Sequence, residues 1–481
     1  MDARRNPGKR DAGRGLIRVP CSAWLPFVAL STVLGPVAVA RTYTLQEAVK
    51  DAVRQSDSVA AAEAKVAGAR AKADEALYMF TPKVSLSGGW AHLDTAPYVD
   101  TTIDFTEMLP DELLTNPFLE PTLSTMEPQT IRMYMGRQDN FQFQLQGEQV
   151  LFAGTALYRQ RAMALADLRA TEEELRSARH DVVYQAEELF WRLALAREAV
   201  KVTQEAIETA EAHVKLLDSY VKTGVATEAD RMSARVQVAS LKLKALQVQQ
   251  SLELAENAFR ALVHVPDDEP IELNLEDGLM PLEVDTDPDA LVKLARESRP
   301  EMRMLDQKRL STEHAAGATW ASWLPAVALQ GNVYLKNPDR AIEPNWYWSG
   351  DITLGFQWNL WDRGAALQKH RQALAGLAQI DAYRRQLHDG IKLEIDQAIA
   401  TYRQADQQVK VAQEGVSLAE ENLRLRQASF DRGVSRSVDV LEAQTSLSKA
   451  RLDLLEAETN YHVAVAGLRK AIGIDDERVE R

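Results

Sequence analysis

Residues 348–360 read WSGDITLGFQWNL, in which apolar or small residues at even positions alternate with polar or small residues at odd positions. Successive side chains of a strand point to opposite faces, so this period of two predicts a strand with one apolar and one polar face. Asp351, Thr353 and Gln357 fall on the polar face.

Three other segments show the same alternation. The second of them sets aromatic and aliphatic residues against Gln142, Gln144 and Gln146. Strands are expected at about 83–92, 140–151, 326–335 and 348–360. The side chains expected to face the membrane are Phe141, Phe143, Leu145, Ile352, Leu354, Phe356 and Trp358.

Segments of about ten residues with an apolar outer face and a polar inner face are typical of transmembrane β-barrels. Of the eight tryptophans after residue 40, only Trp191 falls in the middle of an expected helix, and interfacial aromatic belts explain the clustering of the others around the strands. An ordinary half-buried sheet is the alternative, but it leaves the very long flanking helices unexplained. Because open strand edges are not tolerated in lipid, we expect the chain to share its barrel with copies of itself, and three copies would supply twelve strands.

The chain contains two copies of one unit. Segment 80–88 matches 323–331 at an offset of 243, whereas the Gly224-Val225 pair matches Gly433-Val434 at an offset of 209. The difference indicates a 34-residue insertion in the first copy. Five prolines in this stretch predict an extracellular loop at about 93–139. The expected domains are a first repeat at 41–264, a linker at 265–286 and a second repeat at 287–481.

Each repeat is expected to run helix, strand, strand, very long helix, tight turn and returning helix. The long helices, at about 156–221 and 365–431, would each reach roughly 100 Å. The returning helices carry heptad seams, which predict knobs-into-holes packing. The seams are Ala234, Val238, Leu241, Ala245, Val248, Leu252, Ala255 and Phe259 in the first copy, and Ala443, Leu447, Ala450, Leu454, Ala457, Tyr461, Ala464 and Leu468 in the second. A helical bundle or solenoid explains the helices equally well, so they do not by themselves select the class.

The first forty residues are expected to be an export signal. Basic residues precede an apolar run at 24–39, and Ala38-Val39-Ala40 supplies a cleavage site. The alternative, a short membrane anchor, fits poorly because prolines interrupt the run. Cys21 precedes the apolar run and is therefore not expected to be acylated. Removing the signal takes away six basic and two acidic residues and moves the net charge from −14 to −18, which argues against nucleic acid as a partner.

These features together resemble the TolC family of outer-membrane efflux channels over essentially the whole chain after residue 40. The opening segment at 43–49, YTLQEAV, is similar to the family's N-terminal segment. The Leu324-Pro325 pair before a strand is similar to the pattern that precedes strands in the family. The most specific resemblance is the turn segment 429–443, SFDRGVSRSVDVLEA, with its first-copy partner around Gly224. The hairpin tips are accordingly expected at about 220–230 and 429–439.

The resemblance implies a mainly α protein with a membrane β-barrel portion, in which a trimeric twelve-stranded barrel continues into a periplasmic α-helical tunnel with a closed iris. It implies a homotrimer in outer-membrane lipid that docks to a periplasmic membrane-fusion adaptor and an inner-membrane transporter of the RND or ABC type. The acids that it places at the channel entrance are Asp230, Asp439 and Glu442. The tip residues that it assigns to adaptor contact are Gly224, Val225, Thr227, Gly433, Val434 and Ser437. Phe430 and Ser435 stand where family members carry a tyrosine–arginine latch.

Asp439 also has a simpler interpretation, as an exposed acid in a first helical turn favoured by the helix dipole. From the residues alone, Thr227 and Ser437 are candidate helix caps.

No catalytic or metal-binding motif is present in the sequence. It lacks His-Glu-x-x-His, Gly-x-Ser-x-Gly and phosphate-loop patterns, so we expect no enzyme activity and no cofactor. His180, His213 and His314 are expected to be surface residues of helices. The expected function is the exit duct of a tripartite efflux pump. The alternatives are an exit duct for type I protein secretion, a periplasmic coiled-coil scaffold, or a periplasmic enzyme on a helical bundle.

Overall fold

The computed structural model describes residues 41–105, 107–114, 117–123, 125–266, 269–275, 287–338 and 343–474. The signal peptide expected at 1–40, with Cys21, lies outside these residues, and so do residues 267–268 and 276–286 of the expected linker.

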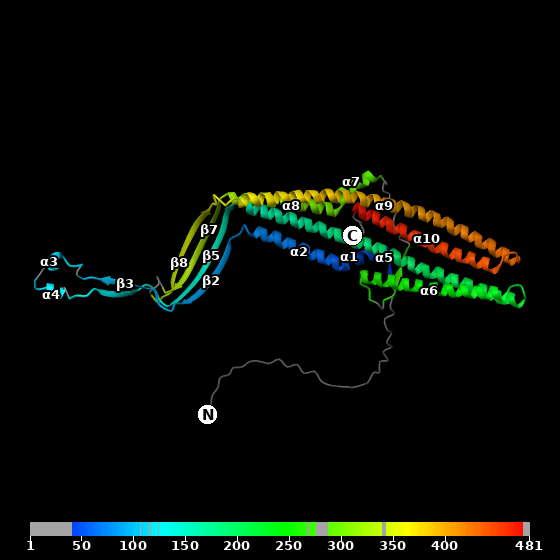
Figure 1. The fold of residues 1–481 in the computed structure, drawn as a ribbon, viewed down its shortest axis with the longest axis horizontal. Helices are drawn as coiled ribbons and strands as arrows, with labels where there is room; N and C mark the ends of the chain where they lie inside the picture. The colour runs from blue at the N-terminus through cyan, green and yellow to red at the C-terminus, as the bar shows by residue number, and fades with distance from the viewer. Residues whose placement is uncertain are drawn as a thin grey trace, which may run out of the picture.

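The molecule is mostly helical and very elongated, with a sheet at one end of a long helical body (Figure 1). Two groups of elements follow each other in the same order: helix, two strands, a very long helix and a returning helix. The first group is α2 (Asp57–Tyr78), β2 (Lys83–His92), β5 (Asp139–Ala153), α5 (Ala156–Lys222) and α6 (Glu228–Val263). The second group is α8 (Pro300–Thr319), β7 (Ala326–Asn337), β8 (Tyr347–Gln357), α9 (Ala365–Asp431) and α10 (Ser437–Ile472).

The strands form one antiparallel sheet in the order β2-β5-β7-β8. The register pairs Leu145 with Val333 and Leu329 with Leu354, so the apolar sides of the strands fall on the same face. A single irregularity, between Val150 and Phe152, shifts the pairing of β5 with β7 near its end. Strand β8 (Tyr347–Gln357) ends three residues earlier than expected.

The order of the strands continues into the helices. Beside the sheet, α2, α5, α8 and α9 pack in that order, and toward the far end α6, α5, α10 and α9 do so. Both α5 and α9 are 67 residues long, about 100 Å at 1.5 Å per residue. On α6 and α10 the heptad seam positions are buried or half-buried, with Ala234, Phe259 and Leu468 nearly inaccessible.

A belt of short elements surrounds the middle of the long helices, where α6 and α10 end. In the first half of the chain, α1 (Leu45–Gln55) packs on α5 and α6; in the second half, α7 (Pro288–Ser298) packs on α9 and α10. A capping box starts α1, since Thr44 and Glu47 exchange hydrogen bonds with each other's backbone N–H groups. The first belt cluster is centred on Tyr43, Leu45, Val49, Phe190, Leu193, Phe259 and Val263, and the second on Leu291, Ala295, Ile391, Ile395, Leu468 and Ile472.

The expected linker is less irregular than its composition predicts. Residues Ile271–Leu273 form strand β6, which pairs in parallel with β1 (Arg41–Tyr43). Arg197 of α5 donates a 2.6 Å hydrogen bond to the carbonyl of Ile271. The start of the linker is therefore part of the belt.

The 34-residue insertion, expected as an extracellular loop at about 93–139, has secondary structure of its own. It contains a two-stranded ribbon, β3 (Tyr98–Ile103) with β4 (Gln129–Tyr134), and two one-turn helices, α3 (Asp111–Leu114) and α4 (Glu120–Leu123). Cross-strand pairs hold the ribbon together: Arg132 forms two hydrogen bonds to Asp100, and Tyr98 packs edge-on against Tyr134. The ribbon projects beyond the sheet, at the end of the molecule opposite the helical tips (Figure 1).

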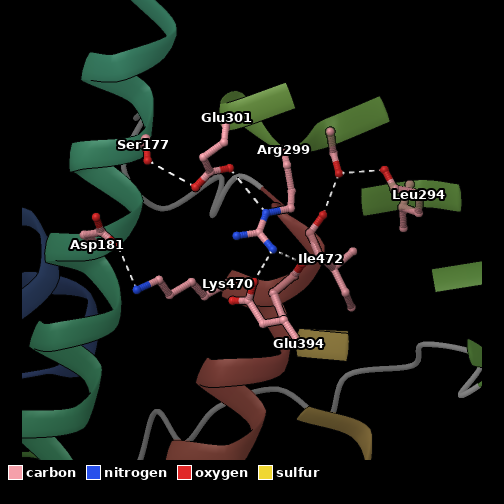
Figure 2. Close-up of polar contacts among 10 residues, drawn as sticks. Ser177, Asp181, Leu294, Arg299, Glu301, Glu394, Lys470 and Ile472 are labelled. Atoms are coloured by element: carbon pink, nitrogen blue, oxygen red, sulfur yellow. Dashed lines mark hydrogen bonds and ion pairs between the residues drawn. The ribbon is translucent and has the colours of Figure 1, made fainter. Parts of the chain in front are cut away.

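A polar network ties the second half of the belt to α5 (Figure 2). Arg299, between α7 and α8, is 8% exposed and donates to Glu394 of α9 at 2.5 Å and to Glu301 of α8 at 3.2 Å. Ser177 of α5 donates to the other oxygen of Glu301 at 3.2 Å. Beside this network, Lys470 of α10 pairs with Asp181 of α5 at 2.6 Å. These contacts join α5, α8, α9 and α10 at the same position along the helical body.

Candidate functional site

Two regions carry the residues expected to be functional: the sheet at one end and the two helical hairpin tips at the other. The apolar face of the sheet is exposed. Leu86, Ile352 and Phe356 are 74%, 82% and 78% exposed, values typical of solvent-facing rather than core side chains. Nothing in the described part of the protomer covers this face, and an exposed apolar surface of this kind marks contact with lipid or with another protein.

The opposite face of the sheet is polar and internally hydrogen-bonded. Asn332 of β7 is 6% exposed and accepts a bond from Gln144 of β5 at 3.2 Å. Its amide donates to Asp351 of β8 at 2.9 Å, and Thr353 donates to the same carboxylate oxygen at 3.4 Å. The chain therefore holds its polar side chains together across three strands on one face only.

Aromatic residues gather at both ends of the sheet. At the end near the ribbon, Trp346 packs against Phe141 and Phe143 with ring centroids 6.2 and 6.1 Å apart. At the end near the helices, the indole N–H of Trp358 donates to the carbonyl of Trp323 at 3.0 Å. Trp358 follows the end of β8, so it is placed by this bond and not by the strand in which it was expected.

The first hairpin tip joins α5 to α6 through a tight turn. Gly224 adopts the left-handed conformation, with φ of 79°, and the N–H groups of Val225 and Ala226 both bond to the carbonyl of Tyr220. This satisfies a carbonyl that the end of α5 would otherwise leave free. Thr227 then begins α6 with a capping box, accepting from the N–H of Asp230 at 3.1 Å while its own N–H donates to the Asp230 carboxylate at 3.0 Å.

The second tip repeats the turn but not the cap. Gly433 has φ of 75°, and the N–H groups of Val434 and Ser435 both bond to the carbonyl of Ser429. The expected cap, Ser437, is instead the first residue of α10. The residue at the cap position is Arg436, whose guanidinium has no acceptor atom.

The acids expected at the channel entrance lie at these helix starts. Asp439 accepts from the N–H of Arg436 at 3.0 Å and from the hydroxyl of Ser435 at 2.9 Å, and these bonds hold the pKa of its carboxyl below the usual value. Hydrogen bonds from Thr227 lower the pKa of Asp230 in the same way. The two tips lie side by side, since the rings of Tyr220 and Phe430 are 5.9 Å apart. The positive charge of Arg436 contributes to the lowered pKa of both carboxyls. Glu442 is exposed one turn further along α10.

The tips enclose a small apolar core of their own. Leu217 of α5, Ala234 of α6 and Leu441 of α10 are buried there, and Phe430 of α9 packs against them. The residue at the expected latch tyrosine position therefore packs, partly buried, against this core. The position of the latch arginine, Ser435, bonds to Asp439 instead.

The expectation that His213 lies on the surface is wrong. Its side chain is 5% exposed and forms a 2.9 Å hydrogen bond between its Nε2 and the hydroxyl of Ser437. His213 lies three residues after Ala210 and four before Leu217, both of which are buried. This spacing along one helix face is the sequence signal that could have indicated burial.

In the ranges that the structure describes, no group of three or more histidine, cysteine or carboxylate residues is arranged to hold a metal ion. Among the same residues, no helix is long and apolar enough to cross a membrane.

A sheet with one exposed apolar face and one polar face, joined directly to helical hairpins of this length, is the architecture of channel proteins that extend a membrane sheet into a helical tunnel. The family model described as "Outer membrane efflux protein" matches residues 48–263 and 291–474, and the chain belongs to this family. Its location is the outer membrane, and the family comprises channels rather than enzymes.

Known proteins agree with this assignment. The probable efflux pump outer membrane protein TtgC of Pseudomonas putida is 22% identical over 323 residues, which cover 63% of this chain and 64% of that protein. The chain thus matches just under two thirds of the length of this relative. The crystal structure of the Campylobacter jejuni CmeC outer membrane channel superimposes with a TM-score of 0.70 at 16% identity, covering 89% of this chain and 85% of CmeC. A structure of CusC, studied for folding and transmembrane channel formation, has a TM-score of 0.70 at 16% identity over 90% of this chain and 93% of CusC.

Proposed function

We propose that this protein is the outer-membrane exit duct of a tripartite efflux pump, and that it conducts small molecules or ions passively out of the cell. Three copies form a twelve-stranded barrel that continues into a periplasmic helical tunnel. The observation that carries the proposal is the two-faced sheet, because its exposed apolar face and its hydrogen-bonded polar face match a barrel wall between lipid and a watery channel.

The edges of the sheet support closure by copies of the same chain. With four antiparallel strands in a row, the edge strands β2 and β8 run in opposite directions. The β8 edge of one copy can therefore pair with the β2 edge of the next in the same antiparallel pattern. Closing the sheet in this way leaves no backbone group unpaired in lipid.

The helical body has matching free edges. Toward the tips the outermost helices are α6 and α9, and each exposes a row of large apolar residues. On α9 these are Val411, Leu418 and Leu425, spaced by seven residues, and on α6 they are Val236, Leu243, Leu246 and Leu254. Packing of α6 against α9 of the next copy would cover both rows with coiled-coil spacing.

The tips supply a contact surface for a periplasmic adaptor. Val225 and Val434, each directly after its left-handed glycine, are 71% and 81% exposed at the ends of the hairpins. We infer that the tip residues Gly224, Val225, Thr227, Gly433 and Val434 form the region where a membrane-fusion adaptor docks. Ser437, which was also expected in this region, is only 3% exposed and therefore does not contribute to that surface. We infer that an inner-membrane transporter of the RND or ABC type supplies the energy, which agrees with the lack of a phosphate-loop motif in the sequence.

The test compares two adjacent residues of β8. Leu354→Arg places a charge on the apolar face and Thr353→Arg places the same charge on the polar face. At the bilayer midplane we expect a cost of about 2–4 kcal/mol on the lipid side and much less on the channel side. Leu354→Arg should therefore abolish outer-membrane trimers, as measured by native mass spectrometry and by trimer bands in gel electrophoresis of unheated samples. Thr353→Arg should still form trimers, and these should show altered conductance in planar bilayers. Equal loss of trimers in both variants would contradict the barrel.

A further inference from the structure

His213 and Ser437 join the two helical hairpins inside the molecule. They are 224 residues apart in the chain, one near the end of α5 and the other at the first turn of α10, and both are almost completely buried. Two further polar contacts between the hairpins on the tip side of the belt, Gln237 with Thr445 and Arg451 with Glu205, are exposed. Water competes with exposed contacts, so the buried pair is the polar bond that fixes the distance between hairpins.

The surroundings of the bond are apolar on each side. The ring of Phe430 lies 5.6 Å from that of His213 and 5.9 Å from that of Tyr220. Leu217 and Leu441, each four residues further along the helix from His213 and Ser437, form a buried apolar cluster with Ala234 of α6. A hydrogen bond shielded in this way is strengthened, and separating the hairpins would leave two buried polar groups without partners unless water entered.

Ser437 is the start of the helix that carries the entrance acids. Its neighbour Arg436 cannot cap α10 through its side chain, whereas in the first hairpin Thr227 caps α6 fully. The bond from His213 therefore fixes a helix start that lacks a hydroxyl cap, two residues before Asp439. The residue in the corresponding place of the first tip, Glu228, is 53% exposed.

We propose that His213 is the positioning residue of the gate: its bond to Ser437 holds the start of α10, with Asp439 and Glu442, against α5 and keeps the periplasmic mouth narrow. This rests on the proposed exit-duct function. The residues at the two latch positions assist this bond: Phe430 packs beside it, and Ser435 orients Asp439 through a hydrogen bond. Moving the α9–α10 hairpin outward must break the His213–Ser437 bond and admit water to it.

Protonation of His213 would favour that movement. Burial alone lowers its pKa. The charged groups on neighbouring turns are paired with one another: Glu211 of α5 with Lys242 of α6, Asp218 of α5 with Arg231 and Arg235 of α6, and Asp439 of α10 with Arg436. From α9, the group that faces the ring is the uncharged Phe430.

The direction of the pH effect follows from this lowered pKa. Because the pKa of His213 is lowered in the narrow arrangement, this arrangement binds fewer protons than an open, hydrated one. The narrow arrangement is therefore favoured at high pH, and its population decreases as the pH falls below about 6.5. Each pH unit below that value should shift the ratio of narrow to open by up to about tenfold per copy.

The experiment measures conductance of full trimers in planar bilayers at pH 7.5 and 5.5. We expect the wild type to be nearly closed at pH 7.5 and to open at pH 5.5. His213→Gln, which can still bond to Ser437 but does not titrate, should stay nearly closed at both. His213→Leu and Ser437→Ala, which remove the bond, should be open already at pH 7.5. The matched control is His462→Gln, because His462 is half-buried, stacked on Trp191 at 3.7 Å, and also has a pKa lowered by burial, but belongs to the belt. Its pH response should equal that of the wild type.

Each result is decisive for one of the two proposals. Opening of His213→Gln at pH 5.5 to the wild-type extent, or closed trimers of both His213→Leu and Ser437→Ala at pH 7.5, would overturn the role of His213. If His213→Leu does not assemble, Ser437→Ala alone decides. Absence of any trimer or channel from the wild type would instead overturn the exit-duct function.

Discussion

Replacing Arg299 with methionine should loosen the belt without disturbing the tips. Methionine keeps much of the apolar stem that packs near Gly473 but removes the bonds to Glu301, Glu394 and the carbonyl of Ala471. Breaking a fully buried ion pair from one side costs about 3–5 kcal/mol. Glu394 is 47% exposed and can rehydrate, and Glu301 keeps its bond from Ser177, so we expect about 2–3 kcal/mol here.

Native-state hydrogen exchange of the detergent-solubilised protein measures this loss locally. A reduction of about 2–3 kcal/mol in opening free energy predicts amide exchange about 30- to 150-fold faster at 294–303 and 466–474. Arg309→Met is the control, because Arg309 forms an ion pair with Asp381 at 2.9 Å but is exposed, and exposed pairs contribute little. Unchanged exchange in the belt of Arg299→Met, or an equal effect of Arg309→Met, would refute the reasoning.

The same network predicts the direction of acid sensitivity. Arg299 opposes the effect of burial on Glu301 and holds the pKa of that carboxyl below its ordinary value of 4.5. The stabilisation is therefore present above that value and is lost as pH falls through the lowered pKa. Exchange in the belt should accelerate in acid in the wild type and respond less in Glu301→Gln.

Two further predictions concern the tips. Replacing both Asp439 and Glu442 with alanine should weaken two properties of the channel: its preference for cations and its block by multivalent cations added from the periplasmic side. The reason is that six carboxylates in a narrow mouth would concentrate cations. Unchanged selectivity with intact trimers would leave these acids as helix-start residues only. Thr227→Ala should destabilise the start of α6 by about 1 kcal/mol, seen as faster exchange at 228–231, through loss of the capping bonds; the serine variant should behave as wild type, and an equal loss with serine would exclude the cap as the cause.

The strands and long helices could be predicted because each has a sustained period. The alternation in β8 and the heptads of α10 fix which side chains share a face. The left-handed glycines at 224 and 433 mark where the long helices end. The apolar faces of β2, β5, β7 and β8 also come together as the pattern predicts, through a register that pairs Leu329 with Leu354.

The remaining features depend on contacts between distant segments, which no local pattern contains. The three residues of β6 form a strand only because β1 lies beside them. The ribbon β3–β4 is short, exposed and bordered by prolines, so its alternation is too brief to separate from a loop. Ser437 has the right residue type for a cap, but the backbone places the cap one residue earlier, and the hydroxyl is free to meet His213.

The equal length of the returning helices has a mechanical consequence. Both α6 and α10 are 36 residues long and end in the belt, so about 54 Å of paired helix extends beyond it on each hairpin. If the belt acts as a fulcrum, a tilt of about 10° there displaces a tip by about 9 Å over this lever arm. Small changes in the tilt of the hairpins at the belt would therefore be enough to change the diameter of the entrance, while the sheet at the other end keeps its shape.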